Sequence, residues 1–238
     1  MDSLNIIEKY KNIVINEFKD MSLILYGSTV YGVETSDLDI CFFSNKEISN
    51  DRLEKLKYLT RLFHIKNNLA IDEEVPYDNK LIYTKNMIMQ TFKEPPFPYV
   101  ENKYVINPIS KTKEYLSSLE MSKRLLLNIL TVRHNVLFGN ADQIKKYSDE
   151  AWEIIIKIVL SYSEKKEVSI SELINYLYED PYTHAKGELY LGYKTNLKEK
   201  MYYLENCVNE NIRRLEEKNI VTKTLKKKYV FNESWLKK

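Results

Sequence analysis

Glycine is so scarce in this 238-residue chain that it limits the folds available to it. The five glycines make up about 2% of the residues, against roughly 7% in ordinary globular proteins. No G-x-G-x-x-G sequence occurs, which excludes the dinucleotide-binding fingerprint. Gly27 and Gly32 have the spacing of a P-loop, but Val33 and Glu34 follow where that motif requires Lys and Ser or Thr. An all-β fold with many tight hairpins is also disfavoured.

Hydrophobic periodicity divides the chain into an α/β half and a helical half. The first half is expected to contain helices over 4–18 and about 50–67, the second capped by Ser49 or Asn50, and strands over 22–26, 36–43 and 69–75. The second half is expected to contain helices over 112–135, 149–163, 169–179 and 195–218. We therefore predict an α+β fold: a small mixed sheet with flanking helices over 1–92, a proline-containing linker over 93–110, and a helical domain over 111–238.

Cysteine usage and the start of the chain bear on its compartment. Cys41 and Cys207 are too few for a disulfide framework, and Cys41 lies in an apolar run typical of burial. The first residues lack a basic segment followed by an apolar one, and the longest apolar runs are interrupted by Asn128 or Lys157. We expect a cytoplasmic, reduced protein with no membrane partner.

The most informative stretch runs from Leu25 to Ile40. Leu25-Tyr26-Gly27-Ser28 ends an expected strand with a sharp turn, which suits a residue without a Cβ atom. If a helix begins at Ser28, its free N–H groups and the Ser28 hydroxyl form an anion site. Asp37 and Asp39 follow, two residues apart on the next expected strand, so both side chains point from one face.

Two carboxylates placed this close repel each other unless a cation lies between them. Oxygen ligands select a hard metal, and a site completed by substrate phosphates is typical of Mg²⁺. Asp37 and Asp39 are therefore candidate metal ligands, while Gly27 and Ser28 are candidates for holding the phosphates. Together they predict a site for a nucleoside triphosphate.

The pattern hydrophobic-Gly-Ser, a short gap, then Asp-hydrophobic-Asp-hydrophobic resembles the signature of the DNA polymerase β-like nucleotidyltransferase superfamily. The size and the α/β-then-helical layout are similar to bacterial aminoglycoside nucleotidyltransferases. The resemblance implies transfer of AMP from ATP to an acceptor hydroxyl, with release of pyrophosphate. It also implies a third acidic residue, from a later strand, as the base that activates the acceptor. Asp72, Glu73 and Glu74 compete for that role, and we assign Asp72 ahead of Glu74.

The acceptor is less constrained than the reaction. An aminoglycoside needs an acidic cleft, which Asp72, Glu73, Glu74, Glu94 and Glu101 can supply. An RNA acceptor needs basic surface, and residues 218–238 contain seven lysines and one glutamate although the whole chain carries only +2. A protein acceptor, or a non-catalytic nucleotide-binding or toxin–antitoxin module, is a further alternative, and the intact Asp37–Asp39 pair counts against the non-catalytic one.

Two lysines could also contribute positive charge to the expected site. Lys46 and Lys80 are close enough in sequence to contact a triphosphate, but isolated lysines are usually solvated, and we expect both to be exposed.

Overall fold

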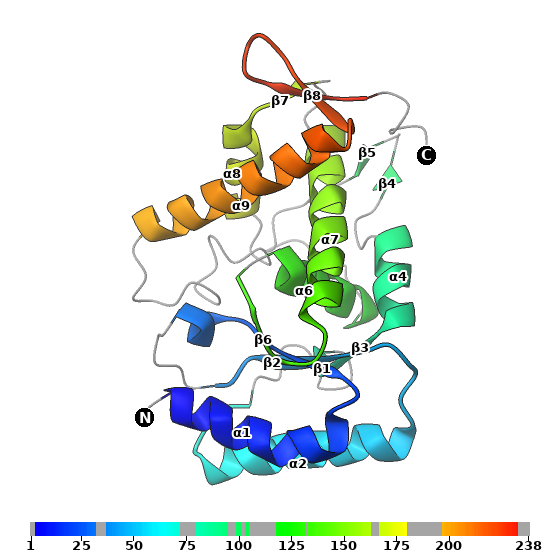
Figure 1. Ribbon diagram of the computed structural model, residues 1–238, viewed down its shortest axis with the longest axis vertical. Helices are drawn as coiled ribbons and strands as arrows, with labels where there is room; N and C mark the ends of the chain where they lie inside the picture. The colour runs from blue at the N-terminus through cyan, green and yellow to red at the C-terminus, as the bar shows by residue number, and fades with distance from the viewer. Residues whose placement is uncertain are drawn as a thin grey trace.

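The computed structural model describes residues 3–31, 37–71, 80–94, 99–100, 103–104, 118–131, 133–162, 167–179 and 197–232 (Figure 1). In the first part of the chain these residues form α1 (Ser3–Phe18), β1 (Ser22–Leu25), the 3₁₀ helix η1 (Ser28–Tyr31), β2 (Ile40–Ser44), α2 (Asn50–Lys66), β3 (Ile82–Thr84) and α4 (Lys85–Lys93). Further along they form β4 (Tyr99–Val100), β5 (Lys103–Tyr104), α6 (Ser118–Thr131), β6 (Asn135–Phe138), α7 (Ala141–Tyr162), β7 (Glu167–Val168), α8 (Ile170–Glu179), α9 (Leu197–Glu217), β8 (Val221–Lys223) and β9 (Tyr229–Phe231).

A four-stranded mixed sheet forms the centre of the first half. Its strand order is β3-β2-β1-β6, in which β2 and β3 run parallel while β1 pairs antiparallel with both β2 and β6. Every residue of β1, β2 and β3 is buried, which explains why these strands are continuous apolar runs rather than alternating ones. The predicted fold class, a small mixed sheet with flanking helices and a further helical region, is confirmed.

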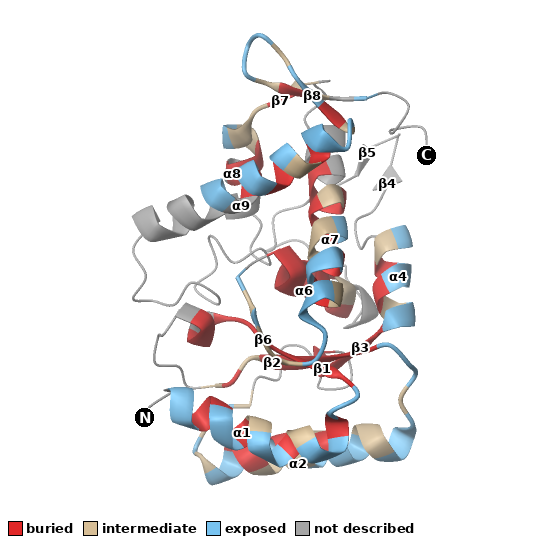
Figure 2. Cartoon of the chain, viewed as in Figure 1, coloured by how far each residue is buried: buried red, intermediate tan, exposed pale blue. Residues whose placement is uncertain are grey.

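Helices cover both faces of this sheet. In Figure 1, α1 and α2 lie on one side of the strands and α4, α6 and α7 on the other. The alternation of side chains along β1 matches this arrangement, because Leu23 and Leu25 pack with the α1 and α2 core while Ile24 packs with α6 and α7. Figure 2 shows the consequence: buried residues follow the strands and the inner faces of the helices.

Local signals fixed several helix boundaries as expected. The Ser49 hydroxyl accepts a hydrogen bond from the Arg52 main-chain N–H, so α2 begins at the predicted cap. Ser169 and Glu172 form a reciprocal capping box at the start of α8: the Ser169 hydroxyl accepts from the Glu172 N–H at 3.1 Å, and a Glu172 carboxylate oxygen accepts from the Ser169 N–H at 2.7 Å.

Three expectations for the second half were wrong. The helix expected over 112–135 ends at Thr131, and Asn135–Phe138 form β6, the edge strand of the first sheet. The helix expected over 149–163 begins already at Ala141, because the Asn140 side chain accepts from the Gln143 N–H and caps it there. The lysine-rich segment over 218–238, where no strand was expected, contains a hairpin, since β8 and β9 pair antiparallel and β7 joins them.

The long helix α7 contributes to two hydrophobic cores. Residues from its first half, among them Ile144 and Tyr147, pack under the first sheet. Trp152, Ile155 and Ile156 belong instead to a second core shared with β7, α8, α9, β8 and β9. The division of the chain at 93–110 stays a prediction, and the first sheet takes its fourth strand from beyond that segment. Among the described helices, none has the length and apolar character needed to cross a membrane.

Candidate active site

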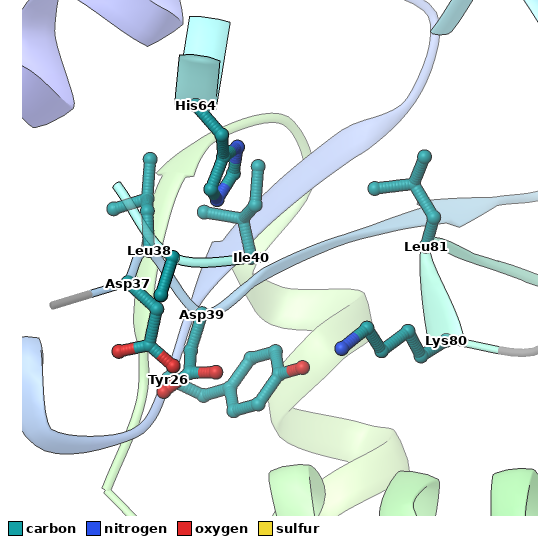
Figure 3. Close-up of a pocket in the computed structure, with 9 residues that line it drawn as sticks. Tyr26, Asp37, Leu38, Asp39, Ile40, His64, Lys80 and Leu81 are labelled. Atoms are coloured by element: carbon teal, nitrogen blue, oxygen red, sulfur yellow. The ribbon is translucent and has the colours of Figure 1, made fainter. Parts of the chain in front are cut away.

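The predicted metal ligands lie in a recess where β1 ends and β2 begins (Figure 3). The ladder between these strands finishes with Leu25 opposite Ile40, and one further hydrogen bond joins the Tyr26 N–H to the Asp39 carbonyl oxygen at 3.0 Å. The recess is small, with a cavity volume of about 20 Å³, enough for about one water molecule. Its lining comes from five parts of the chain: Tyr26, Asp37, Leu38, Asp39, Ile40, His64, Ala70, Lys80 and Leu81.

Gly27 is the residue that lets Asp39 occupy this recess. Its φ of +73° lies in the left-handed region, which side chains other than glycine rarely adopt. A Cβ atom at this position would lie 2.0 Å from Oδ2 of Asp39, so any larger residue would displace that carboxylate. The Val30 N–H donates to the Gly27 carbonyl oxygen at 3.3 Å and closes the turn. The sharp turn expected at Gly27 is confirmed, together with a steric reason for it.

Asp37 and Asp39 both direct their carboxylates to the same side of the recess (Figure 3). They were expected on a strand, but β2 begins only at Ile40 and the two residues precede it. The physical reason is that β1 turns away at Gly27, so no partner strand extends beyond Leu25. The segment nevertheless keeps the feature that matters chemically, because both half-buried carboxylates meet at one place.

Ser28 begins η1, which is four residues long. This single 3₁₀ turn follows Gly27 directly and is short for the helix whose free N–H groups were expected to form an anion site. The role of Ser28 in holding phosphate stays a prediction.

Lys80 is a component of the recess that sequence reasoning treated as a solvated residue. Its side chain is only 8% exposed, and Figure 3 shows it extending across the recess toward Tyr26 and Asp39. The signal available in the sequence was its position directly before Leu81 and Ile82, which begin a buried strand. Lys46, in contrast, is exposed as expected.

His64, near the end of α2, connects that helix to the carboxylate segment. The imidazole is 3% exposed, and its Nδ1 lies 2.8 Å from the Thr60 carbonyl oxygen. Burial lowers the pKa of His64 below its ordinary value, while the Thr60 carbonyl, the charge of Asp37 and the Leu38 main chain act in the opposite direction. A neutral, buried imidazole therefore supports the main chain that carries the two aspartates.

The third carboxylate cannot be located among the described residues. Asp72, Glu73 and Glu74 lie outside them, and so does most of the strand expected over 69–75, of which the described part, residues 69–71, is not a strand. Within the described ranges no group of three or more His, Cys, Asp or Glu side chains is placed to hold a metal ion. Ala70 lines the recess, so the chain enters the site two residues before Asp72.

Comparison with known proteins agrees with this geometry. Residues 7–90 match the family model described as a nucleotidyltransferase domain. The matched segment runs from α1 through β3 into α4 and contains the Gly27 turn, both aspartates, His64 and Lys80. This part of the chain is thus similar to nucleotidyltransferase domains. No curated protein and no solved structure matches the chain significantly.

Proposed function

We propose that the protein is a Mg²⁺-dependent nucleotidyltransferase that transfers AMP from ATP to a hydroxyl group of a small molecule, such as an aminoglycoside-type antibiotic. The observation that carries the proposal is the meeting of Asp37 and Asp39 in one recess, with Oδ2 of Asp39 against the bare Cα of Gly27. The nucleotidyltransferase match over residues 7–90 supports the same reaction.

The donor set fits a hard divalent cation. Asp37 and Asp39 offer carboxylate oxygens at one recess, and coordination shared between protein carboxylates and substrate phosphates is typical of Mg²⁺. When bound, Mg²⁺ would offset the charge of the triphosphate and the charge that develops during transfer.

The chain's own groups then have separate tasks. Gly27 and Ser28 would hold the β- and γ-phosphates at the turn, and the Lys80 ammonium would add a positive charge directed at the triphosphate. Asp72 would accept the proton of the acceptor hydroxyl, with Glu74 as the alternative base. The hydroxyl oxygen forms a bond to the α-phosphorus while the bond between that phosphorus and the bridging oxygen breaks, and pyrophosphate leaves in line.

The choice of ATP and of a small cationic acceptor rests on the resemblance in layout to aminoglycoside nucleotidyltransferases. Of the five acidic residues that would attract such an acceptor, Glu94 is described and exposed, while Asp72, Glu73, Glu74 and Glu101 lie outside the described residues. An RNA acceptor is the second candidate, and it is favoured by the lysine-bearing hairpin of β8 and β9.

The test offers each nucleoside triphosphate, labelled at the α-phosphate, with Mg²⁺ and a panel of aminoglycosides, lincosamides, tRNA and protein. We expect label from ATP to appear on an aminoglycoside. Asp37→Asn and Asp39→Asn should each lower the rate by about 10³-fold or more, because metal binding supplies several kcal/mol of transition-state stabilisation.

Asp51→Asn is the matched control, because Asp51 is an exposed aspartate on α2 and should be dispensable for transfer. Circular dichroism and a thermal melt establish that each variant is folded. Full activity of both recess variants would overturn the assignment of the carboxylate pair. If only tRNA is labelled, the acceptor is RNA rather than a small molecule. If the protein binds Mg-ATP tightly but labels no acceptor, the proposed transfer reaction is contradicted.

A further inference from the structure

The last third of the chain forms a unit with its own sheet and core. Its elements follow the order α7, β7, α8, α9, β8, β9, and its antiparallel sheet has the strand order β7-β9-β8 (Figure 1). The second hydrophobic core lies between this sheet and the three helices, with members such as Trp152, Leu173, Ile212 and Tyr229. The sequence alone predicted helices here and no strand.

This order of elements is the topology of a winged helix. A first helix leads to a short strand, two further helices pack against each other, and a hairpin closes the sheet with its second strand in the centre. The two packed helices, α8 and α9, take the places of a helix-turn-helix pair, with residues 180–196 as a longer connection between them. The β8–β9 hairpin, residues 221–231, is the wing.

We propose that this wing is a docking surface for the phosphate backbone of a structured RNA. Between Lys218 and Asn232 the chain contains five lysines and no acidic residue. Lys223, Lys226 and Lys227 are all exposed, and Leu225 stands fully exposed at the tip. Lys218 pairs with Glu153, whereas the lysines of the hairpin itself form a local concentration of positive charge, the electrostatic feature that phosphate backbones recognise.

The loop of the wing holds these lysines in a defined arrangement. The Thr224 N–H donates to the Lys228 carbonyl oxygen at 2.7 Å, and the Lys227 N–H donates to the Thr224 carbonyl oxygen at 3.0 Å. Lys227 has a φ of +58°, a left-handed conformation that favours glycine or asparagine.

The surface of α9 favours RNA over duplex DNA. Among the α9 residues whose exposure the structure describes, Glu205, Glu210, Glu216 and Glu217 are exposed and Arg213 is the one exposed basic residue. Inserted into the DNA major groove, this face would meet the flanking phosphates with like charge. An A-form RNA stem has a deep, narrow major groove that admits no helix and is recognised mainly through its shape and its phosphates. Contact through the wing is therefore suited to an RNA stem.

The test measures binding of the full-length protein to an RNA stem–loop of about 16 base pairs, by fluorescence anisotropy over a range of KCl concentrations. The variant K223Q/K226Q/K227Q removes the three exposed wing lysines. The matched control K9Q/K66Q/K85Q removes three exposed lysines from α1, α2 and α4, so both proteins lose the same net charge. A thermal melt establishes that both are folded.

We expect the wing variant to bind roughly 100-fold more weakly near 0.15 M salt, with a log–log salt slope smaller by about 3, while the control binds like the wild type. Equal losses in both variants would overturn the proposal, since the effect would then follow net charge alone. So would tighter binding to DNA duplex of the same sequence or to anionic lipid vesicles. The Asp37→Asn variant should retain full RNA binding, which separates this proposal from the proposed catalysis.

Discussion

The carboxylate recess and the wing use charge in opposite ways. In the recess, half-buried Asp37 and Asp39 meet buried Lys80, and a single glycine determines where Asp39 lies. On the wing, all the charged side chains are lysines, and three of them are exposed on a hairpin. A site of the first kind fails when one residue changes, because each group depends on the position of the others. A surface of the second kind loses affinity in roughly equal steps, one phosphate contact at a time.

The largest effect expected on the rate of transfer, apart from loss of the metal carboxylates, concerns the proposed base. We expect Asp72→Asn to lower the rate of transfer by roughly 10²–10⁴-fold, because the acceptor hydroxyl would keep its proton as it attacks. Glu74→Gln, the matched control two residues further on, should have a much smaller effect. Steady-state rates at several pH values provide the measurement. The reverse ranking would transfer the role of base to Glu74.

Some parts of the structure could be predicted from the sequence and others could not, and the difference has a physical reason. The Gly27 turn, the meeting of Asp37 with Asp39 and the start of α2 at Ser49 are decided by residues near one another in the chain, so they were predicted. β6 and the burial of Lys80 depend on distant partners. β6 is four residues long, half exposed, and exists as a strand only because it pairs with β1.

The wing was missed for a related reason. Read along the sequence, Lys223 to Lys228 resemble a solvated tail, because the strands beside them are three residues each. Their pairing becomes stable when β7 and the core under α9 are present, and periodicity does not reveal such contacts.

A core substitution tests whether the two regions are separate cooperative units. Ile212 on α9 is buried in the second core, and Ile24 on β1 is buried in the first. Ile212→Ala and Ile24→Ala should each cost about 2–5 kcal/mol of local stability. Hydrogen exchange should show that Ile212→Ala lowers amide protection mainly in α8, α9 and the wing, and Ile24→Ala mainly in β1 and β2. Equal losses everywhere would mean that α7 joins both cores into one unit.

Alanine substitutions at two glycines test the recess against the opposite end of the same sheet. Gly27 and Gly139 both have positive φ, and a Cβ atom at Gly139 would lie 2.4 Å from Cα of Ser22, far from the carboxylates. Gly27→Ala and Gly139→Ala should each cost about 1–3 kcal/mol in urea unfolding, because both positions are strained for alanine. Only Gly27→Ala should also lower transfer markedly, since it displaces Asp39. Equal transfer by both variants would show that the position of Asp39 is unimportant.

The smallest effects on the free energy of unfolding are expected from breaking two ion pairs, one in each region. Arg52 joins Asp20 beside the first sheet through bonds of 2.7 and 3.0 Å, and Arg214 joins Asp149 beside the second core. The first pair is the more exposed, so Asp20→Asn should cost about 0.2–1 kcal/mol and Asp149→Asn somewhat more.

The pH dependence of the first pair has a defined sign. The hydrogen bond from Arg52 lowers the pKa of Asp20 below its ordinary value. A carboxylate with a lowered folded-state pKa stabilises the protein above its unfolded-state pKa, and this contribution disappears as the pH falls through the folded value. The stability difference between wild type and Asp20→Asn should therefore be constant near neutrality and shrink below about pH 4, as urea titrations at pH 7 and pH 3 would reveal. A difference close to zero at both pH values would mean that Arg52 stabilises the protein through its contacts with Phe18 and the Glu17 carbonyl instead.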